Sequence, residues 1–264
     1  MPEFTAKDVQ ALRQATGAGM MDAKRALDVN AGNAEAAAKW LREQGLAKAD
    51  KRSDRENSQG TVAVSVDGNV AGIALLKCET DFVAKSDQFT SLVQEIATLV
   101  ALKGEDAAQE KAAAIDDLKV VLKENIELGQ VVRVEAGDGN VVDSYVHRQD
   151  GRGVNAVIVE LDGGTPELAH DVAVHVAFTK PQYLSRDQVP EAEVAEERAT
   201  LLSISKAEGK PEAALDKIVE GRLTGWFKER VLLEQSYVKD EKQTISNLLG
   251  DATVVRYEQV AIGV

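Results

Sequence analysis

Apolar side chains recur at helical spacing in three short stretches of the first fifty residues. Thr5 has the sequence context of a helix N-terminal cap, and the first helix ends at a glycine-containing break over residues 16–19. A second stretch begins at Met20, and Asn33 can cap a third helix that stops at Gly45. The pattern predicts a compact module of three helices.

A polar linker spans residues 48–60, and the pattern then changes to alternating apolar and polar positions over residues 61–66. A turn at residues 67–69 leads into the apolar run of residues 70–76, which predicts a β-hairpin. Apolar residues between 89 and 100 then recur every three or four positions, so we expect an amphipathic helix on one face of these strands.

The same order of elements recurs in the second half of the chain. Asp150 and Gly151 form a turn like Asp67 and Gly68, residues 154–161 form an apolar strand, and Thr165 opens a helix. The two copies lie too far apart for a solenoid, whose repeats are about 20 to 50 residues long. We therefore predict two related lobes, each an antiparallel sheet with packed helices.

A long helical stretch begins after Pro190, breaks at residues 209–211 and resumes over residues 215–226. Its narrow apolar stripes and charged opposite faces predict an antiparallel helical hairpin that protrudes, and residues 253–257 return as a strand to the second lobe. The fold class is α+β. The predicted units are 1–55 for the three-helix module and linker, 56–140 for the first lobe, 141–182 with 229–264 for the second lobe, and 183–228 for the hairpin.

Composition restricts the classes of protein to which the chain can belong. Apolar residues make up 44% and charged residues 28%, which excludes a disordered chain. The net charge of −13 and an aromatic content of 4% argue against nucleic-acid binding. A basic leader segment and an apolar stretch of about 18 to 20 residues are both missing, so we expect a cytoplasmic protein without membrane contact. The single cysteine, Cys78, fits a reducing compartment.

Residues for catalysis are sparse. The sequence contains neither a P-loop nor a Gly-x-Gly-x-x-Gly fingerprint. His170 and His175 lie five residues apart, off the i, i+4 spacing of a helical metal pair, and His147 stands alone. Cys78 ends an apolar strand, where a thiol is usually inert. We expect a protein that is not an enzyme and that uses neither a metal nor a cofactor.

Two segments are hard to explain as scaffold alone. In residues 16–22, glycines place Met20 and Met21 at a helix start, where adjacent side chains point about 100° apart and cannot both enter one core. An alternative is that Met20 is a core residue and Met21 is half exposed. In residues 78–85 a strand leads directly into a helix.

If Thr80 caps that helix, Asp81 and Phe82 occupy its first turn and project from the tip of the lobe. The alternative is one unbroken helix. Phe82 then lies seven residues before Phe89 and joins the same core stripe.

These two segments resemble the signature stretches of the elongation factor Ts family, namely Leu12-Arg13 with residues 16–22 (TGAGMMD), and residues 79–85 (ETDFVAK). Further matches follow in family order at residues 144–147, 175–181, 209–211 and 219–222. The similarity covers essentially the whole chain.

The resemblance implies a module similar to ubiquitin-associated domains, a two-lobed core, a protruding coiled coil, and a heterodimer with the translational GTPase elongation factor Tu. It implies guanine-nucleotide exchange on that GTPase during translation elongation, without direct nucleotide binding. Arg13, Met20 and Met21 would dock on the nucleotide-binding domain of the GTPase. Asp81 and Phe82 match a pair that wedges beside its magnesium and phosphate site.

The resemblance also implies contacts with another domain of the GTPase. His147 matches one such contact, and Tyr237 and Val238 fall where the family has a further contact loop. Ser236-Tyr237 stands where many relatives have Pro-Phe, and the sequence lacks the additional C-terminal helical module of some relatives. The contacts of that region are therefore left open.

Two other functions remain possible from the residues alone. One is a non-catalytic adaptor whose N-terminal module binds a protein partner without any nucleotide exchange. The other is a thiol enzyme that uses Cys78 and a histidine.

Overall fold

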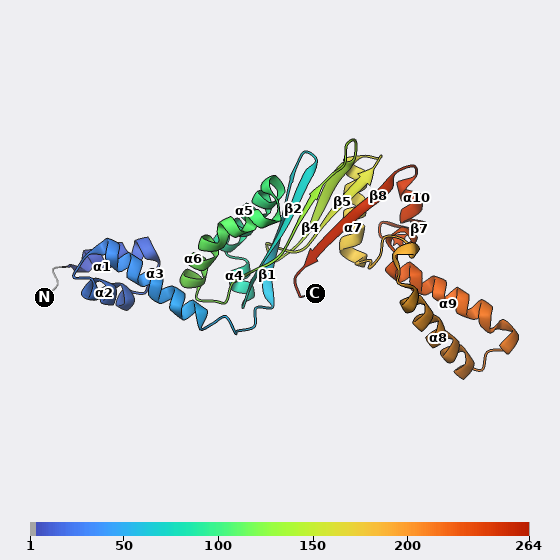
Figure 1. The fold of residues 1–264 in the computed structure, drawn as a ribbon, viewed down its shortest axis with the longest axis horizontal. Coiled ribbons are helices and arrows are strands. Elements are labelled where there is room, and N and C mark those ends of the chain that lie inside the picture. The colour runs from blue at the N-terminus through green and yellow to red at the C-terminus, as the bar shows by residue number, and fades with distance from the viewer. Residues whose placement is uncertain (1–3, 264) are drawn as a thin grey trace.

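The computed structural model describes residues 4–263. Residues 1–3 and 264, which the predicted units 1–55 and 229–264 include, lie outside the described residues. The molecule is elongated, with three helices at one end, two antiparallel sheets with their helices in the middle and a helical hairpin at the other end (Figure 1). The predicted α+β class is confirmed. No helix within residues 4–263 is both long and apolar enough to cross a bilayer.

The N-terminal helices are α1 (Ala6–Thr16), α2 (Met20–Val29) and α3 (Ala34–Asp50). The predicted cap at Thr5 is present as a capping box, in which Thr5 and Asp8 each bond the other's backbone N–H through their side chains. Small and branched apolar residues from all three helices form a separate core, made of Val9, Leu12, Ala23, Ala26, Leu27, Ala37 and Leu41.

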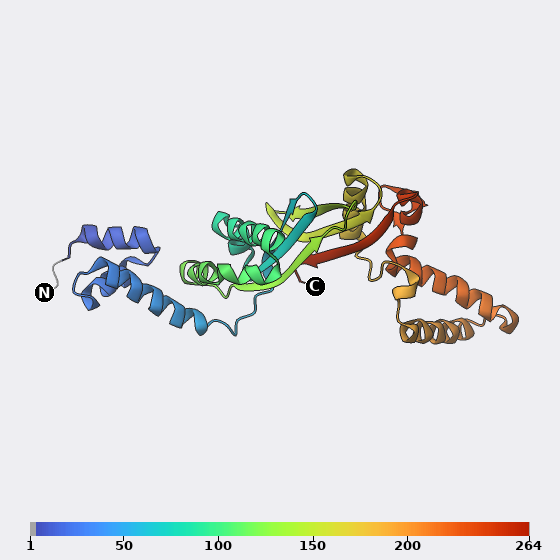
Figure 2. The same cartoon turned by 45° about the horizontal axis from the view of Figure 1, so that its top comes forward.

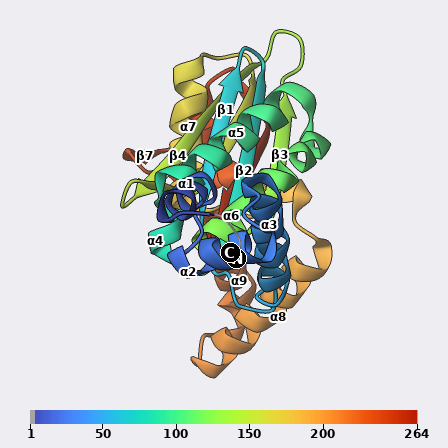
Figure 3. The same cartoon turned by 90° about the vertical axis from the view of Figure 1, so that its left-hand side faces the viewer.

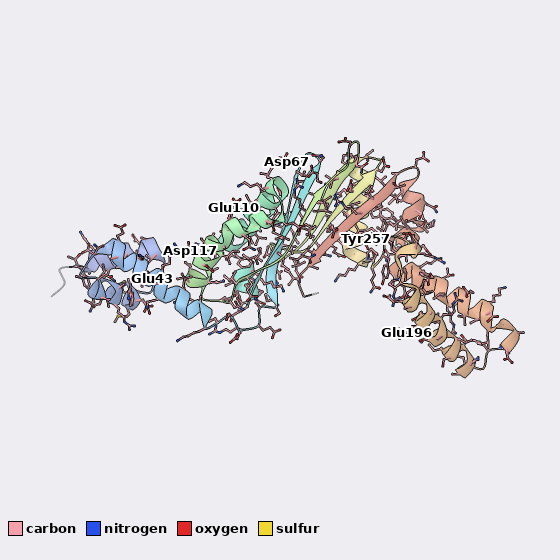
Figure 4. All side chains as sticks on the ribbon, in the orientation of Figure 1. Glu43, Asp67, Glu110, Asp117, Glu196 and Tyr257 are labelled. Carbon is pink, nitrogen blue, oxygen red and sulfur yellow. The ribbon has the colours of Figure 1, made fainter. Side chains whose placement is uncertain are left out.

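The predicted end of the third helix at Gly45 is wrong, because α3 continues to Asp50. Gly45 instead allows close packing against α6 (Ala112–Leu122), since a Cβ atom placed on Gly45 would lie 2.5 Å from a methyl carbon of Val120. An ion pair of 3.1 Å between Arg42 and Asp117 lies along the same contact, and Figure 4 labels Asp117 on α6. The non-helical linker therefore covers only residues 51–58.

The first sheet has the strand order β1 (Gln59–Asp67), β2 (Val70–Cys78), β3 (Glu127–Glu135), with all pairs antiparallel. The predicted hairpin turn is confirmed, with Gly68 in the left-handed region at φ +59°. The helix α5 (Asp87–Lys103), the 3-10 segment η1 (Glu105–Lys111) and α6 cover one face of this sheet. Their shared core includes Ala63, Ala74, Leu76, Phe89, Val93, Ile96, Val100 and Ile126.

The second sheet repeats this topology. Its strands are β4 (Val141–Gln149), β5 (Arg152–Asp162) and β8 (Thr253–Ala261), in the order β4-β5-β8, and α7 (Pro166–Thr179) covers its outer face. In both sheets a hairpin is followed by a helix, and the third strand joins beside the second strand of the hairpin. This is the repeat that the sequence predicts.

The inner faces of the two sheets pack on each other. Apolar side chains from both sheets meet in one buried layer, formed by Val62, Ala71, Ile73, Leu75, Val132, Val134, Val142, Ala156, Ile158 and Val260. The helices therefore lie on the two outer sides of a paired sheet (Figure 2). The end-on view places the N-terminal helices in front of these sheets (Figure 3).

The remaining elements lie between α7 and β8. A hairpin of α8 (Glu191–Ala207) and α9 (Leu215–Arg230) extends away from the sheets (Figure 1). Every fourth residue of α9 is buried, namely Leu215, Val219, Leu223 and Phe227. The shorter elements are η2 (Arg186–Gln188), η3 (Glu212–Ala214), η4 (Leu232–Glu234), β6 (Ser236–Tyr237), β7 (Asp240–Thr244) and α10 (Ile245–Leu249).

Candidate functional site

Phe82 is 74% exposed on a helix of one turn, α4 (Asp81–Ala84), which follows β2 directly. Thr80 caps this helix by accepting a hydrogen bond from the backbone N–H of Val83 at 3.3 Å, as the sequence predicts. Ala84 is buried and Val83 packs against the core of the first sheet, so α4 directs Phe82 outward while its other side is anchored.

The helix is short because Ser86 has an extended backbone, with φ −69° and ψ 146°, and serves as the N-cap residue of α5. Its hydroxyl donates to the carbonyl of Val83 at 2.8 Å. The unbroken helix that would have placed Phe82 on the stripe of Phe89 is therefore wrong. Sequence reasoning missed Ser86, although a serine followed by an aspartate is a common start of a helix.

Lys85 contacts both of the exposed residues of α4. Its ammonium group donates to the Asp81 carboxylate at 2.9 Å and lies 4.9 Å from the centroid of the Phe82 ring. This hydrogen bond is the main reason that the pKa of Asp81 is lowered, and the charges of Lys85 and Arg152 lower it further. Asp81 is thus an exposed, ionised carboxylate beside an exposed aromatic ring.

The two residues just before α4 are held by Glu124. Its carboxylate accepts hydrogen bonds from the backbone N–H groups of Glu79 and Thr80, at 3.0 and 3.1 Å. Its other oxygen accepts the hydroxyl of Thr80 at 2.5 Å. Glu124 lies in the loop between α6 and β3, far from α4 in the sequence. No local spacing could have indicated this contact.

The second predicted group lies where α1 turns into α2. Gly17 takes the left-handed conformation at φ +67° that ends α1, and its N–H bonds the carbonyl of Arg13 at 2.9 Å. Arg13 is exposed, as are Met20 at 49% and Met21 at 71%. The alternative that places Met20 in the core is therefore wrong. The buried side of α2 consists of Ala23, Ala26 and Leu27.

His147 is exposed near the end of β4, and its Nδ1 lies 3.3 Å from the hydroxyl of Tyr145. Tyr237 is only 4% exposed and belongs to the core of the second sheet. Its side chain therefore offers little surface of its own, and its role as a contact residue stays a prediction. Val238 is half-buried, and its N–H donates to Nδ1 of the buried His175 at 3.3 Å.

A sequence model of the family described as Elongation factor TS matches residues 79–264, which contain α4, its supporting loop and the whole second sheet. The chain belongs to the elongation factor Ts family. Similar proteins named Elongation factor Ts include that of Paenarthrobacter aurescens, 42% identical with 96% of each chain covered. Those of Clavibacter michiganensis (42% identical, 100% of each chain) and Deinococcus radiodurans (40% identical, 97% of this chain and 99% of the relative) are also similar.

In this member of the elongation factor Ts family, Cys78 ends β2 just before α4, and its thiol lies 3.2 Å from the carbonyl oxygen of Thr80. The thiol of Cys78 is buried, and this burial, with a smaller effect of the Glu124 charge, raises its pKa to about 12. That pKa disfavours the thiol-enzyme alternative. A cluster of three potential metal ligands is not found among residues 4–263.

Proposed function

We propose that this translation elongation factor is a guanine-nucleotide exchange factor for elongation factor Tu and that Phe82 is its principal wedge. The observation that carries the proposal is the position of Phe82 on α4. Its side chain is 74% exposed, and Glu124 accepts hydrogen bonds from the residues that begin this helix. A large exposed aromatic ring on a fixed backbone is the arrangement expected of an anchor that enters a partner's pocket.

The free energies involved are compatible with this role. A nanomolar GDP complex is held by about 12 kcal/mol, so exchange must be accelerated by favouring a nucleotide-poor state of the GTPase. Burial of Phe82 in the GTPase would contribute roughly 1.5 to 3 kcal/mol toward displacing the elements that hold magnesium and phosphate. Asp81 adds a smaller electrostatic competition that salt weakens.

Coupling between the two ligands of the GTPase is reciprocal. A factor that lowers the affinity of the GTPase for nucleotide has its own affinity for the GTPase lowered by the nucleotide to the same extent. GTP binding therefore releases the factor. The chain makes and breaks no covalent bond in this cycle, and it needs neither a cofactor nor direct contact with the nucleotide.

The remaining contacts follow from the family signatures. Arg13, Met20 and Met21 would dock on the nucleotide-binding domain, through a module similar to ubiquitin-associated domains. His147 and the segment of Tyr237 and Val238 would reach another domain of the GTPase in a cytoplasmic heterodimer. The α8–α9 hairpin would act as a protruding coiled coil.

A non-catalytic adaptor is the second candidate. Met20, Met21 and Val29 of α2 are exposed at 49%, 71% and 60%, and exposed apolar side chains of this kind are able to contact a protein without the participation of α4. This candidate predicts binding of a partner through the N-terminal module and no effect of Phe82 on nucleotide release.

The deciding experiment is stopped-flow release of a fluorescent GDP analogue from elongation factor Tu. It compares the wild type with Phe82→Ala and with Phe178→Ala, since Phe178 is 78% exposed on α7 and is a matched control. All three proteins are first checked for folding by circular dichroism.

We expect strong acceleration by the wild type and by Phe178→Ala, and a loss of most of it in Phe82→Ala. A folded wild type that does not accelerate release would favour the adaptor. Equal acceleration by all three would keep the exchange function but remove Phe82 from it.

A further inference from the structure

The linker between the N-terminal module and the first sheet is fixed at several points. Arg52 donates to the carbonyl of Lys119, in the last turn of α6, at 2.9 Å. The side-chain amide of Asn125 donates to the carbonyls of Ser53 and Arg55, at 3.1 and 2.8 Å. Asn125 itself is only 5% exposed, so these bonds are shielded from water.

The same short loop also holds the start of α4. The backbone N–H of Asn125 donates to the Glu79 carboxylate at 2.6 Å, and the neighbouring Glu124 accepts the backbone N–H groups of Glu79 and Thr80. Glu79 in turn lies 3.5 Å from the guanidinium of Arg55 in the linker. Glu79, Glu124 and Asn125 are called the brace from here on.

The brace is continuous with the docking of the N-terminal module. The loop that carries Glu124 and Asn125 begins at the end of α6, where Lys123 takes the left-handed conformation at φ +60°. The helix α3 packs along α6 through Gly45 and through the Arg42–Asp117 ion pair. One connected set of contacts therefore runs from the three-helix module to the backbone that carries Phe82.

We propose that Glu124 is a positioning residue for Phe82 and that the brace makes the N-terminal module and α4 a single rigid contact unit. Binding of the module to the GTPase then delivers Phe82 in a fixed orientation. This inference rests on the proposed exchange function, because it assigns to Glu124 a role that acts only through Phe82.

The physical reason is preorganisation. Hydrogen bonds to an ionised carboxylate are stronger than neutral ones, and Glu124 makes three of them to the cap of a one-turn helix. A helix of one turn does not hold itself together, so its geometry depends on such outside contacts. Without Glu124, α4 samples several orientations, and part of the binding energy of Phe82 is used to order it.

The first test is a double-mutant cycle of Glu124→Ala and Phe82→Ala, read as the maximal rate of GDP release at saturating factor. We expect Glu124→Ala to lower this rate about tenfold when Phe82 is present, and less than about twofold in the Phe82→Ala background. The factor concentration at half-maximal rate should change little, because the module still docks. Glu110→Ala is the control, since Glu110 pairs with Lys103 away from α4 (Figure 4).

Glu124→Gln keeps one acceptor oxygen and should give a rate between those of the wild type and Glu124→Ala. It also replaces the alanine variant if that variant does not fold. Equal fold-losses in the two Phe82 backgrounds, or unchanged rates in both Glu124 variants, would overturn the positioning role.

The second test needs no partner. Amide hydrogen exchange of the free protein should be faster over residues 79–84 in the Glu124 variants, with strands β1 and β2 unchanged. Unchanged exchange at residues 79–84 would overturn the brace regardless of what the GTPase does. If the wild type fails to accelerate GDP release while this exchange effect is present, the proposed function fails and the brace is only structural.

Discussion

The ammonium group of Lys85 lies 4.9 Å from the ring centroid of Phe82 while donating a hydrogen bond to Asp81 at 2.9 Å. Both contacts favour the arrangement in which the Asp81 carboxylate and the Phe82 ring lie beside the same ammonium group. Lys85 therefore contacts the side chains of Phe82 and Asp81, whereas Glu124 contacts the backbone and cap that precede them.

We predict that Lys85→Met lowers the maximal rate of GDP release about twofold to fivefold, because an exposed cation–π contact and an i, i+4 ion pair are each worth about 0.3 to 1 kcal/mol. The rate is measured by stopped flow at low and high salt, and the difference from wild type should shrink as salt screens the pair. Lys103→Met, which removes a comparable pair with Glu110, is the control. A Lys85→Met rate at or above that of the wild type would contradict the prediction.

His175 is predicted to make stability pH-dependent. Its ring is fully buried, Nδ1 accepts the N–H of Val238, and Nε2 lies 2.9 Å from the side-chain oxygen of Gln235, so the ring is the neutral Nε2–H form. Burial lowers the pKa of His175 below 6.5, and the Gln235 hydrogen bond offsets part of this effect.

The unfolded chain therefore takes up a proton at His175 at a higher pH than the folded protein does. The free energy of unfolding falls as the pH drops below about 6.5, and this fall levels off below the lowered pKa of the folded state. Urea unfolding between pH 7.5 and 5 measures it. We expect His175→Gln to be less stable by about 1 to 3 kcal/mol at pH 7.5 and to lose this part of the pH dependence. His170→Gln, an exposed histidine on the same helix, should resemble the wild type.

Glu160 is the buried acceptor that holds the connection between the two sheets. One carboxylate oxygen accepts the backbone N–H of Gly137 at 2.8 Å and the amide of Asn140 at 2.7 Å, and the other accepts from Arg256 at 2.8 Å. Burial alone would raise the pKa of Glu160, but these hydrogen bonds outweigh it and the pKa is lowered.

We predict that Glu160→Ala lowers the free energy of unfolding by about 2 to 4 kcal/mol, because it leaves several donors without an acceptor. Arg256→Met should lower the free energy of unfolding by less, since the Arg256 side chain is 40% exposed and the Glu160 carboxylate keeps two donors. Urea unfolding of both variants is compared with that of Glu196→Ala, an exposed residue of α8 labelled in Figure 4. A loss in Glu160→Ala no larger than in the control would contradict the role of Glu160.

The sequence predicts those features whose causes are local. The cap at Thr5, the turn at Gly68 and the cap at Thr80 each depend on residues within a few positions, and all three are present. The repeated hairpin, helix and strand could be predicted because apolar spacing differs between helices and strands. The exposure of Phe82 could not be decided from spacing, because one residue, Ser86, breaks the helix.

Contacts between residues that are distant in the sequence could not be predicted from the pattern of apolar positions. Apolar residues occupy both faces of β1 and β2, but nothing in their spacing tells which face meets α5 and which meets the second sheet. Glu124 supports Thr80 from 44 positions away. Tyr237 is buried although it falls where the family has a contact loop, because its ring packs into the core of the second sheet.

The position of Gly45 also depends on a contact that is distant in the sequence. A glycine near the end of a helical pattern usually indicates a terminus, yet here it lies inside α3 because Val120 of α6 occupies the space of its side chain. In an open helix interior, Gly→Ala stabilises by about 0.5 to 1 kcal/mol. At Gly45 the new methyl group would lie 2.5 Å from a Val120 methyl carbon, so one helix must move.

We therefore predict that Gly45→Ala lowers the thermal unfolding midpoint and speeds amide exchange in α3 and α6, because overpacking costs about 1 to 3 kcal/mol. The matched control is Gly221→Ala in α9, where no atom lies within 4 Å and the same change should stabilise. The double variant Gly45→Ala with Val120→Ala should recover much of the loss, because it restores the space between the helices. Stabilisation by Gly45→Ala alone would mean that α3 does not pack on α6 in solution, and the continuity between the module and the brace would then be lost.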